Sequence, residues 1–112
     1  MTLLRREANV LTLEADFPGM QIKKLTGTTG VTEGANVDLA HGIGDVDKII
    51  AWTSRVKFDD NTWVAQGVRN DPINQEFIAF PFTDTNFRLG LRPGNSAALT
   101  SKEFEILVFF FL

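Results

Sequence analysis

Hydrophobic and polar residues alternate over short stretches along most of this chain, and an alternation of period two is typical of half-buried β-strands. The pattern is clear at residues 11–15, 50–58 and 87–92. Between such stretches lie clusters of Gly, Pro, Asn and Asp, which favour turns because they adopt tight backbone conformations or bond the local backbone. Seven or eight short strands joined by turns predict an all-β antiparallel sandwich of the jelly-roll kind.

The longest predicted strand runs from Val46 to Phe58. Its alternation places five residues on one face, namely Ile50, Trp52, Ser54, Val56 and Phe58. Residues 59–62 have the composition of a hairpin turn, so residues 63–68 should return antiparallel. We therefore expect Trp63 to form a cross-strand pair with Phe58.

The last nine residues, Phe104–Leu112, contain eight apolar residues, and such a run is typical of a strand covered on both faces. Successive strand residues point to opposite faces. One face should then carry Phe104, Ile106, Val108 and Phe110, and the other Leu107, Phe109 and Phe111. The second face needs cover from the same chain or from a second copy. Helix-forming material is scarce, so we expect an oligomer whose interface contains Phe109, Phe110, Phe111 and Leu112.

The first 27 residues differ from the rest. Residues 2–8 have the composition of a short helix, residues 11–15 alternate like a strand, and residues 27–30 are small and polar like a joint. These features predict an N-terminal attachment arm or hairpin over 1–27 and a β-sandwich domain over 28–112. The alternative, that residues 1–27 are ordinary strands of the same sandwich, stays open.

Composition limits the chemistry of the chain. It has 112 residues, no Cys and a net charge of -3, so disulfides and thiolate metal sites are excluded and no basic stripe for nucleic acid is present. The apolar run at residues 104–112 is too short for a membrane helix, which needs about 20 residues. Ten Phe without any Tyr indicate a dry core or a dry interface.

No catalytic or metal constellation stands out. His41 is the one histidine, and no Gly-x-Ser-x-Gly motif accompanies it. We expect His41 to close a turn through a backbone hydrogen bond, with a weak pH sensor as the alternative. Asp and Asn at residues 45–47, 59–61 and 84–86 fit turns better than a calcium loop, since no EF-hand spacing is present. No catalytic residue, metal or cofactor is therefore predicted.

The best candidates for ligand contact are an aromatic side chain and a long polar loop. Trp63, at a hairpin end, is suited to stacking on a sugar ring. The loop that follows offers planar hydrogen-bonding groups from Arg69, Asn70, Asp71 and Asn74. Loops carry binding functions more often than strands do.

One segment resembles a known family. His41–Ile50 is similar to the "G-I-x-x-(V/I)-D-K-I-I" opening of the distal or receptor-binding domain of bacteriophage tail fibres and tail-associated structural proteins. Trp63 and the aromatic strand at 104–112 match later features of that domain, so the resemblance covers residues 31–112. It implies a non-enzymatic, trimeric virion protein on the phage tail that docks on baseplate proteins through residues 1–27 and contacts the host surface or a host-surface glycan through loops. A capsid cement protein that bridges capsomers is the alternative, and a polysaccharide depolymerase is the third interpretation.

Overall fold

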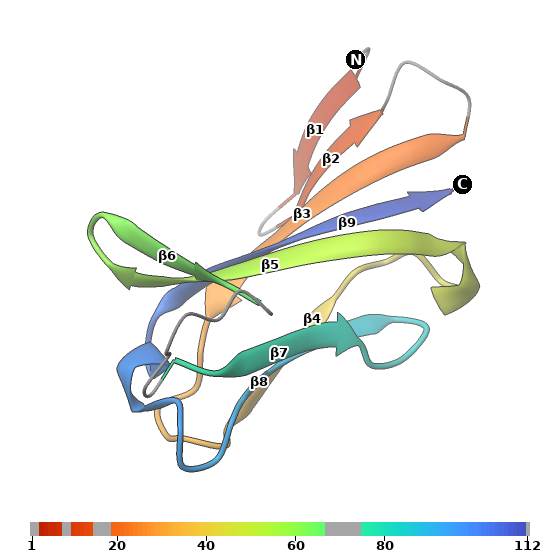
Figure 1. Cartoon of the computed structure of the whole chain (residues 1–112). Helices are drawn as coiled ribbons and strands as arrows, with labels where there is room; N and C mark the ends of the chain where they lie inside the picture. The colour runs from red at the N-terminus through yellow and green to blue at the C-terminus, as the bar shows by residue number, and fades with distance from the viewer. Residues whose placement is uncertain (1–2, 8–9, 15–18, 67–74, 112) are drawn as a thin grey trace.

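The computed structural model describes residues 3–7, 10–14, 19–66 and 75–111, and in them the chain forms nine strands and two short 3-10 turns (Figure 1). The prediction of an all-β chain built from antiparallel strands is confirmed. The strands are β1 Leu3–Glu7, β2 Val10–Glu14, β3 Met20–Thr28, β4 Asn36–Ala40, β5 Ile49–Asp59, β6 Thr62–Ala65, β7 Phe77–Pro81, β8 Asn86–Leu91 and β9 Glu103–Phe111.

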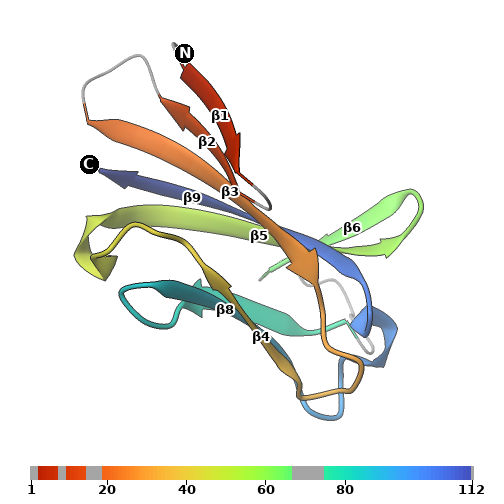
Figure 2. The ribbon, with the colours of Figure 1, turned by 180° about the vertical axis from the view of Figure 1, so that it is seen from behind.

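The strands form two sheets. The larger has the order β1-β2-β3-β9-β5-β6, and the smaller has the order β4-β8-β7. The chain passes between the sheets from β3 to β4, from β4 to β5, from β6 to β7 and from β8 to β9. In Figure 1 the larger sheet lies above the smaller one, and Figure 2 shows β4 in front when the molecule is seen from behind. Strand β9 lies inside the larger sheet, since it pairs along its length with β3 and with β5.

The core lies between the two sheets. The predicted division of the last strand into two faces is confirmed, and the buried face is the one with Phe104, Ile106, Val108 and Phe110. From the smaller sheet they meet Phe87, Leu89 and Leu91 of β8, together with Ala79 of β7. The Trp52 ring packs edge-on against Phe87, with ring centroids 5.8 Å apart.

The N-terminal region is part of the larger sheet. The short helix predicted at residues 2–8 is wrong, because Leu3–Glu7 pairs with β2 as a strand, and ladder hydrogen bonds override a weak local helix preference. Strand β3 pairs with nine residues of β9, and its Leu25 is buried in the core. The boundary predicted near residue 27 therefore falls inside β3, while β1 and β2 extend the sheet beyond it.

Strand β5 is shorter and less regular than predicted. Residues 46–48 form a 3-10 turn capped by the Asp45 side chain, and the strand begins at Ile49. The register with β9 shifts between Ile49 and Ala51, so Ile49 packs against the core while Ile50 is 48% exposed. The prediction that Ile50 shares a face with Trp52 is therefore wrong, because one extra residue in a strand reverses the alternation.

The expected pair of Trp63 with Phe58 is also wrong. The register of β5 with β6 shifts between Lys57 and Asp59, so Phe58 is the extra residue of a second irregularity and packs against the core. Trp63 is instead the partner of Lys57. The predicted turn at residues 59–62 does connect the two strands.

The edge of the smaller sheet at β7 is closed by side chains of the larger sheet. Glu76 pairs with Arg92 and Phe82 with Asn86 through backbone hydrogen bonds, so Ala79 and Pro81 direct their backbone groups away from β8. Pro81 thus loses no ladder bond, which confirms the prediction that it stands at a sheet edge. At Ala79 the carbonyl accepts from Trp52 Nε1 at 2.8 Å, and the N–H donates to Gln66 Oε1 at 2.9 Å.

Candidate functional site

The outer face of the larger sheet, turned away from the smaller sheet, carries a cluster of charges centred on Glu105 of β9. Lys24 Nζ lies 2.8 Å from Glu105 Oε2, and Arg55 Nη2 lies 2.6 Å from Oε1. Arg55 Nε donates a second bond to Oε1 at 2.8 Å. Burial alone would raise the pKa of Glu105, but the hydrogen bonds from Lys24 and Arg55 outweigh it and lower the pKa below its usual value. Glu105 is therefore a carboxylate at neutral pH.

Trp63 of β6 completes this cluster. Its ring lies under the Arg55 guanidinium, with 3.9 Å between the guanidinium carbon and the ring centroid. The Lys57 ammonium lies 5.9 Å from the same centroid. Arg55 is thus held between an aromatic face and a carboxylate, two contacts that fix the plane of its guanidinium.

A hollow of about 350 Å³ opens beside these charges. Its apolar part comes from Thr53, Ala65 and Leu107, and its charged part from Lys24, Arg55 and Glu105. An apolar wall with a few fixed polar groups is the usual composition of a ligand site. The arrangement offers a ligand fixed charged groups beside an apolar surface.

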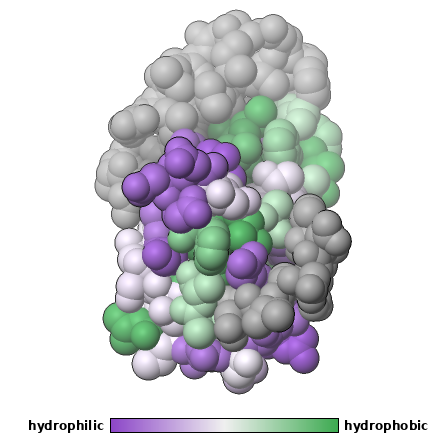
Figure 3. Space-filling model, turned by 60° about the vertical axis from the view of Figure 1, so that its left-hand side comes forward, coloured by the Kyte–Doolittle hydropathy of each residue, from purple (hydrophilic) through white to green (hydrophobic). Residues whose placement is uncertain are grey.

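The same outer face becomes apolar toward the end of β9. Leu107 and Phe109 are half-buried, and Phe111 is 49% exposed. On β3 their register partners are Lys24, Ile22 and Met20, so two further half-buried apolar residues lie beside Phe109 and Phe111. Figure 3 shows how hydrophilic and hydrophobic residues gather in separate patches on one side of the molecule.

The structure places the predicted site residues unequally. Trp63 lies in the charged cluster, and Phe109 and Phe111 lie on the outer face of β9. Phe110, expected at the interface, is only 3% exposed and belongs to the core of its own chain. The alternation that we used for the strand already separates it from Phe109 and Phe111. The remaining predicted residues lie outside the described part of the chain, namely Arg69, Asn70, Asp71, Asn74 and Leu112.

Sequence reasoning missed Lys24, Arg55 and Glu105 as a group. They are far apart in the chain and meet because β3 and β5 both flank β9. The signal in the sequence is weak. Arg55 follows the polar face of its strand, and Glu105 is the one charge inside the apolar run at 104–112.

His41 closes a turn, as expected. Its Nδ1 accepts from the Ile43 N–H at 3.0 Å, and its Nε2 lies 3.1 Å from the Thr83 carbonyl. Gly42 and Gly44 in this turn have positive φ values of 68° and 84°, a conformation that glycine adopts without strain. Both ring nitrogens are occupied by backbone groups, so His41 has a structural role.

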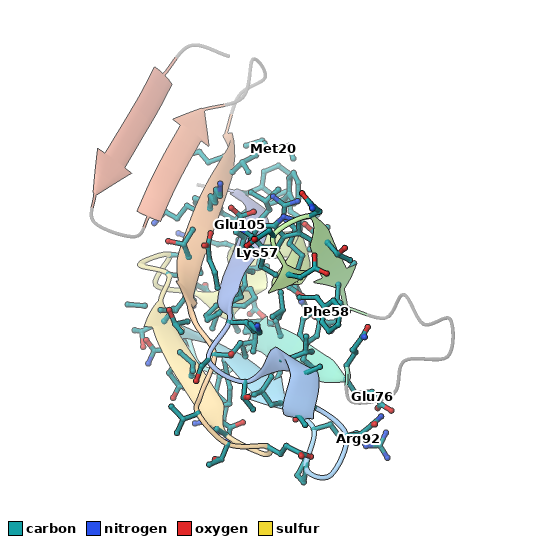
Figure 4. All side chains as sticks on the ribbon, turned by 90° about the vertical axis from the view of Figure 1, so that its left-hand side faces the viewer. Met20, Lys57, Phe58, Glu76, Arg92 and Glu105 are labelled. Atoms are coloured by element: carbon teal, nitrogen blue, oxygen red, sulfur yellow. The ribbon has the colours of Figure 1, made fainter. Side chains whose placement is uncertain are left out.

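A second hollow, of about 580 Å³, lies over β8 on the outer face of the smaller sheet. The hollow is open at Gly90, which has no side chain. A Cβ atom added there would lie 2.7 Å from the Asn36 amide oxygen. At its margin Glu76 accepts from Arg92 and from Asn95. Figure 4 shows Glu76 and Arg92 close together, well apart from Glu105 and Lys57. These charges pair with one another, and the hollow lacks the aromatic clamp found at Trp63.

Comparison with protein-family models, curated proteins and solved structures returned no match. Within the described residues, no group of three or more His, Cys, Asp or Glu side chains is placed to hold a metal ion. In that same part of the chain, no helix has the length and apolar character needed to cross a membrane.

Proposed function

We propose that this chain is a non-enzymatic structural protein of a bacteriophage virion, a tail-fibre or receptor-binding subunit that acts as a homotrimer. In this proposal the N-terminal strands dock the subunit on the tail or baseplate, and loops contact the host surface. The resemblance of residues 41–50 to tail-fibre domains supports the virion role. The outer face of β9 supports the assembly.

The apolar end of β9 is the observation that carries the proposal. An antiparallel sheet with one face in water normally shows polar residues there. Here Leu107, Phe109 and Phe111 follow one another along the outer face of a central strand. Exposed apolar patches larger than a few hundred Å² typically mark interaction sites. A second copy of the chain is the partner that every solution of the protein contains, and closed symmetry prevents open polymerisation.

The strand connections are in keeping with a jelly roll. Adjacent strands β3 and β9 continue across to adjacent strands β4 and β8 in the other sheet. Strands β1 and β2 extend the larger sheet on its β3 side, where a hairpin could reach a docking partner. Both features support the proposal without depending on the apolar face.

The measurement that tests the assembly is the mass in solution. Light scattering after size exclusion should give three copies for the natural chain. Phe111→Asn should lower the mass to one copy, because it places an amide in the apolar contact. Val31→Asn is the matched control, since Val31 is 80% exposed and lies in a loop, and it should leave three copies. A natural chain that is monomeric at all concentrations would refute the trimer.

The location on the particle tests the virion role. Antibody labelling in electron micrographs of the phage should mark the tail. Labelling of the head would replace the tail-fibre proposal with the capsid cement protein, and absence from the particle would refute both.

A further inference from the structure

We propose that the hollow beside Glu105 binds a small ligand that carries an oxyanion, a carboxylate or a phosphate, on an apolar body. The proposal deepens the binding role proposed above and rests on it, because it assigns a ligand chemistry to one part of the outer face. The hollow belongs to the described strands β3, β5, β6 and β9, so it is independent of the loop at residues 67–74.

The charge balance of the cluster favours an anion. Lys24 and Arg55 bring two cations to the lining of the hollow, where Glu105 supplies the one carboxylate. The chain as a whole has a net charge of -3, so this local excess is opposite in sign to the rest of the molecule. A local positive potential attracts anions and raises their concentration at the surface.

Unused donors face the ligand space. Arg55 contacts Glu105 through Nε and Nη2. A guanidinium has five N–H donors and an ammonium has three, so Arg55 Nη1 and two N–H groups of Lys24 remain for a ligand. Trp63 and Glu105 hold Arg55 in place before binding, which reduces the entropy that binding would otherwise cost.

The apolar lining of the hollow favours a ligand whose oxyanion is attached to an apolar body. Thr53, Ala65 and Leu107 line the hollow together with the charged side chains, since Ala65 is the register partner of Arg55 and Leu107 that of Lys24. Its volume of about 350 Å³ suits a single ring rather than a polymer segment. A ring with one oxyanion satisfies both parts, whereas a bare inorganic anion leaves the apolar wall in water.

Glu105 has a defined effect in this scheme. Its carboxylate orients Arg55 and Lys24, but it also repels an incoming anion. Replacing it by the neutral Gln keeps an acceptor for Arg55 while removing the repulsion. Glu105→Gln should therefore strengthen binding, an outcome that a purely structural role would not produce.

The experiment is a titration followed by nuclear magnetic resonance. The probes are phenyl phosphate and benzoate, with phenol as the neutral control and inorganic phosphate as the anion without a body. The two indole N–H signals provide an internal reference, since Trp63 adjoins the cluster while Trp52 donates to Ala79 inside the sandwich. Phenyl phosphate or benzoate should shift the Trp63 signal and the amides of Thr53, Ala65 and Leu107, and 0.5 M salt should weaken the effect. Phenol should produce no saturable shift, and inorganic phosphate should bind more weakly than phenyl phosphate.

Variants separate the hollow from general charge attraction. Arg55→Met and Lys24→Met should each weaken binding by about tenfold, the loss expected for one charged hydrogen bond. Glu105→Gln should strengthen it by about threefold, through the lost repulsion of a partly screened charge. Lys48→Met, which removes an exposed cation from the 3-10 turn, should have no effect.

Three results would overturn the proposal: no saturable shift with either ring anion, equal losses for Lys48→Met and Arg55→Met, or weaker binding in Glu105→Gln. The solution mass distinguishes this failure from that of the assembly. Loss of anion binding with three copies intact removes the ligand alone, and a monomer that still binds the anion removes the trimer alone.

Discussion

His41 shows how one side chain can join two turns. The side chain is 1% exposed, its Nδ1 accepts from Ile43 in its own turn, and its Nε2 reaches Thr83 in the turn before β8. The Ile43 N–H fixes Nδ1 as an acceptor, so the proton of the neutral ring lies on Nε2 and points to the Thr83 carbonyl. Protonation of Nδ1 would turn it into a donor, which would then face the Ile43 N–H, also a donor.

The first prediction concerns this protonation. Burial lowers the pKa of His41 below its ordinary value, and Lys23 adds to this, while Thr83 and Asp84 act in the opposite direction. The Lys23 ammonium donates to the His41 carbonyl, so it faces the turn directly. The folded chain therefore binds a proton less readily than the unfolded chain. Stability should be complete above pH of about 6.5, the ordinary histidine pKa, and should decline as the pH falls through and below that value.

Urea unfolding at steps of half a pH unit from 7.5 to 5.0 measures this decline. Across that range Asp38, Asp59 and Glu105 stay ionised, because the pKa of each is lowered from its ordinary value. The control is His41→Gln, which is expected to be less stable throughout but to show no slope over the range. A natural chain with the same flat profile as the variant would contradict the prediction.

At the scale of the strand, the smaller sheet is closed by interactions that the larger sheet supplies. Gln66 Oε1 accepts from Ser54 Oγ at 2.7 Å as well as from the Ala79 N–H. A backbone N–H can only donate, so the oxygen of the Gln66 amide must face it. This bond and the Trp52 bond give Ala79 the partners that a neighbouring strand would otherwise provide, and an unpaired edge invites pairing with other chains.

The second prediction follows from that acceptor. Gln66→Leu should leave the Ala79 N–H and the Ser54 hydroxyl without a partner and lower the free energy of unfolding by about 2–4 kcal/mol. Gln66→Glu keeps an acceptor oxygen in the same shape and should cost about 1 kcal/mol or less at neutral pH. Urea unfolding of the two variants compares them. Equal losses in the free energy of unfolding would show that the shape of the Gln66 side chain, and not its acceptor oxygen, stabilises the edge at β7.

The strands also show what the sequence can and cannot predict. The alternation in β9 divided its residues correctly between two faces, because β9 pairs with β3 without a register shift and the extra residue in its pairing with β5 belongs to β5. In β5 the predicted face is confirmed for Trp52, Ser54, Val56 and Phe58, which are buried or pack against the core, and it failed at the extra residue Ile50. The second irregularity, at Phe58, separates Trp63 from Phe58. The cluster around Glu105 was not predictable, since it depends on which strands flank β9. That order is set by the packing of the whole sandwich rather than by local pattern.

At the scale of the molecule, β9 serves two purposes through its two faces. Its even-numbered residues fill the core, and Leu107, Phe109 and Phe111 on the other face form the proposed contact with other copies. Folding and assembly should therefore be separable by substitutions one position apart. Phe110→Asp places a charge in a dry core and should cost about 4 kcal/mol or more, which removes most of the stability of a small domain.

Phe111→Asp should behave differently, because half of that side chain is already exposed in one copy. The variant should fold, with a free energy of unfolding within about 1 kcal/mol of the natural chain when both are measured at dilutions where each is monomeric. At higher concentration it should remain a single copy while the natural chain forms three. Phe111→Leu keeps the apolar contact and should assemble. If Phe111→Asp also fails to fold, the outer face of β9 is covered by its own chain; if it still forms three copies, the contact between subunits lies elsewhere. Either result would remove the outer face of β9 from the proposed assembly.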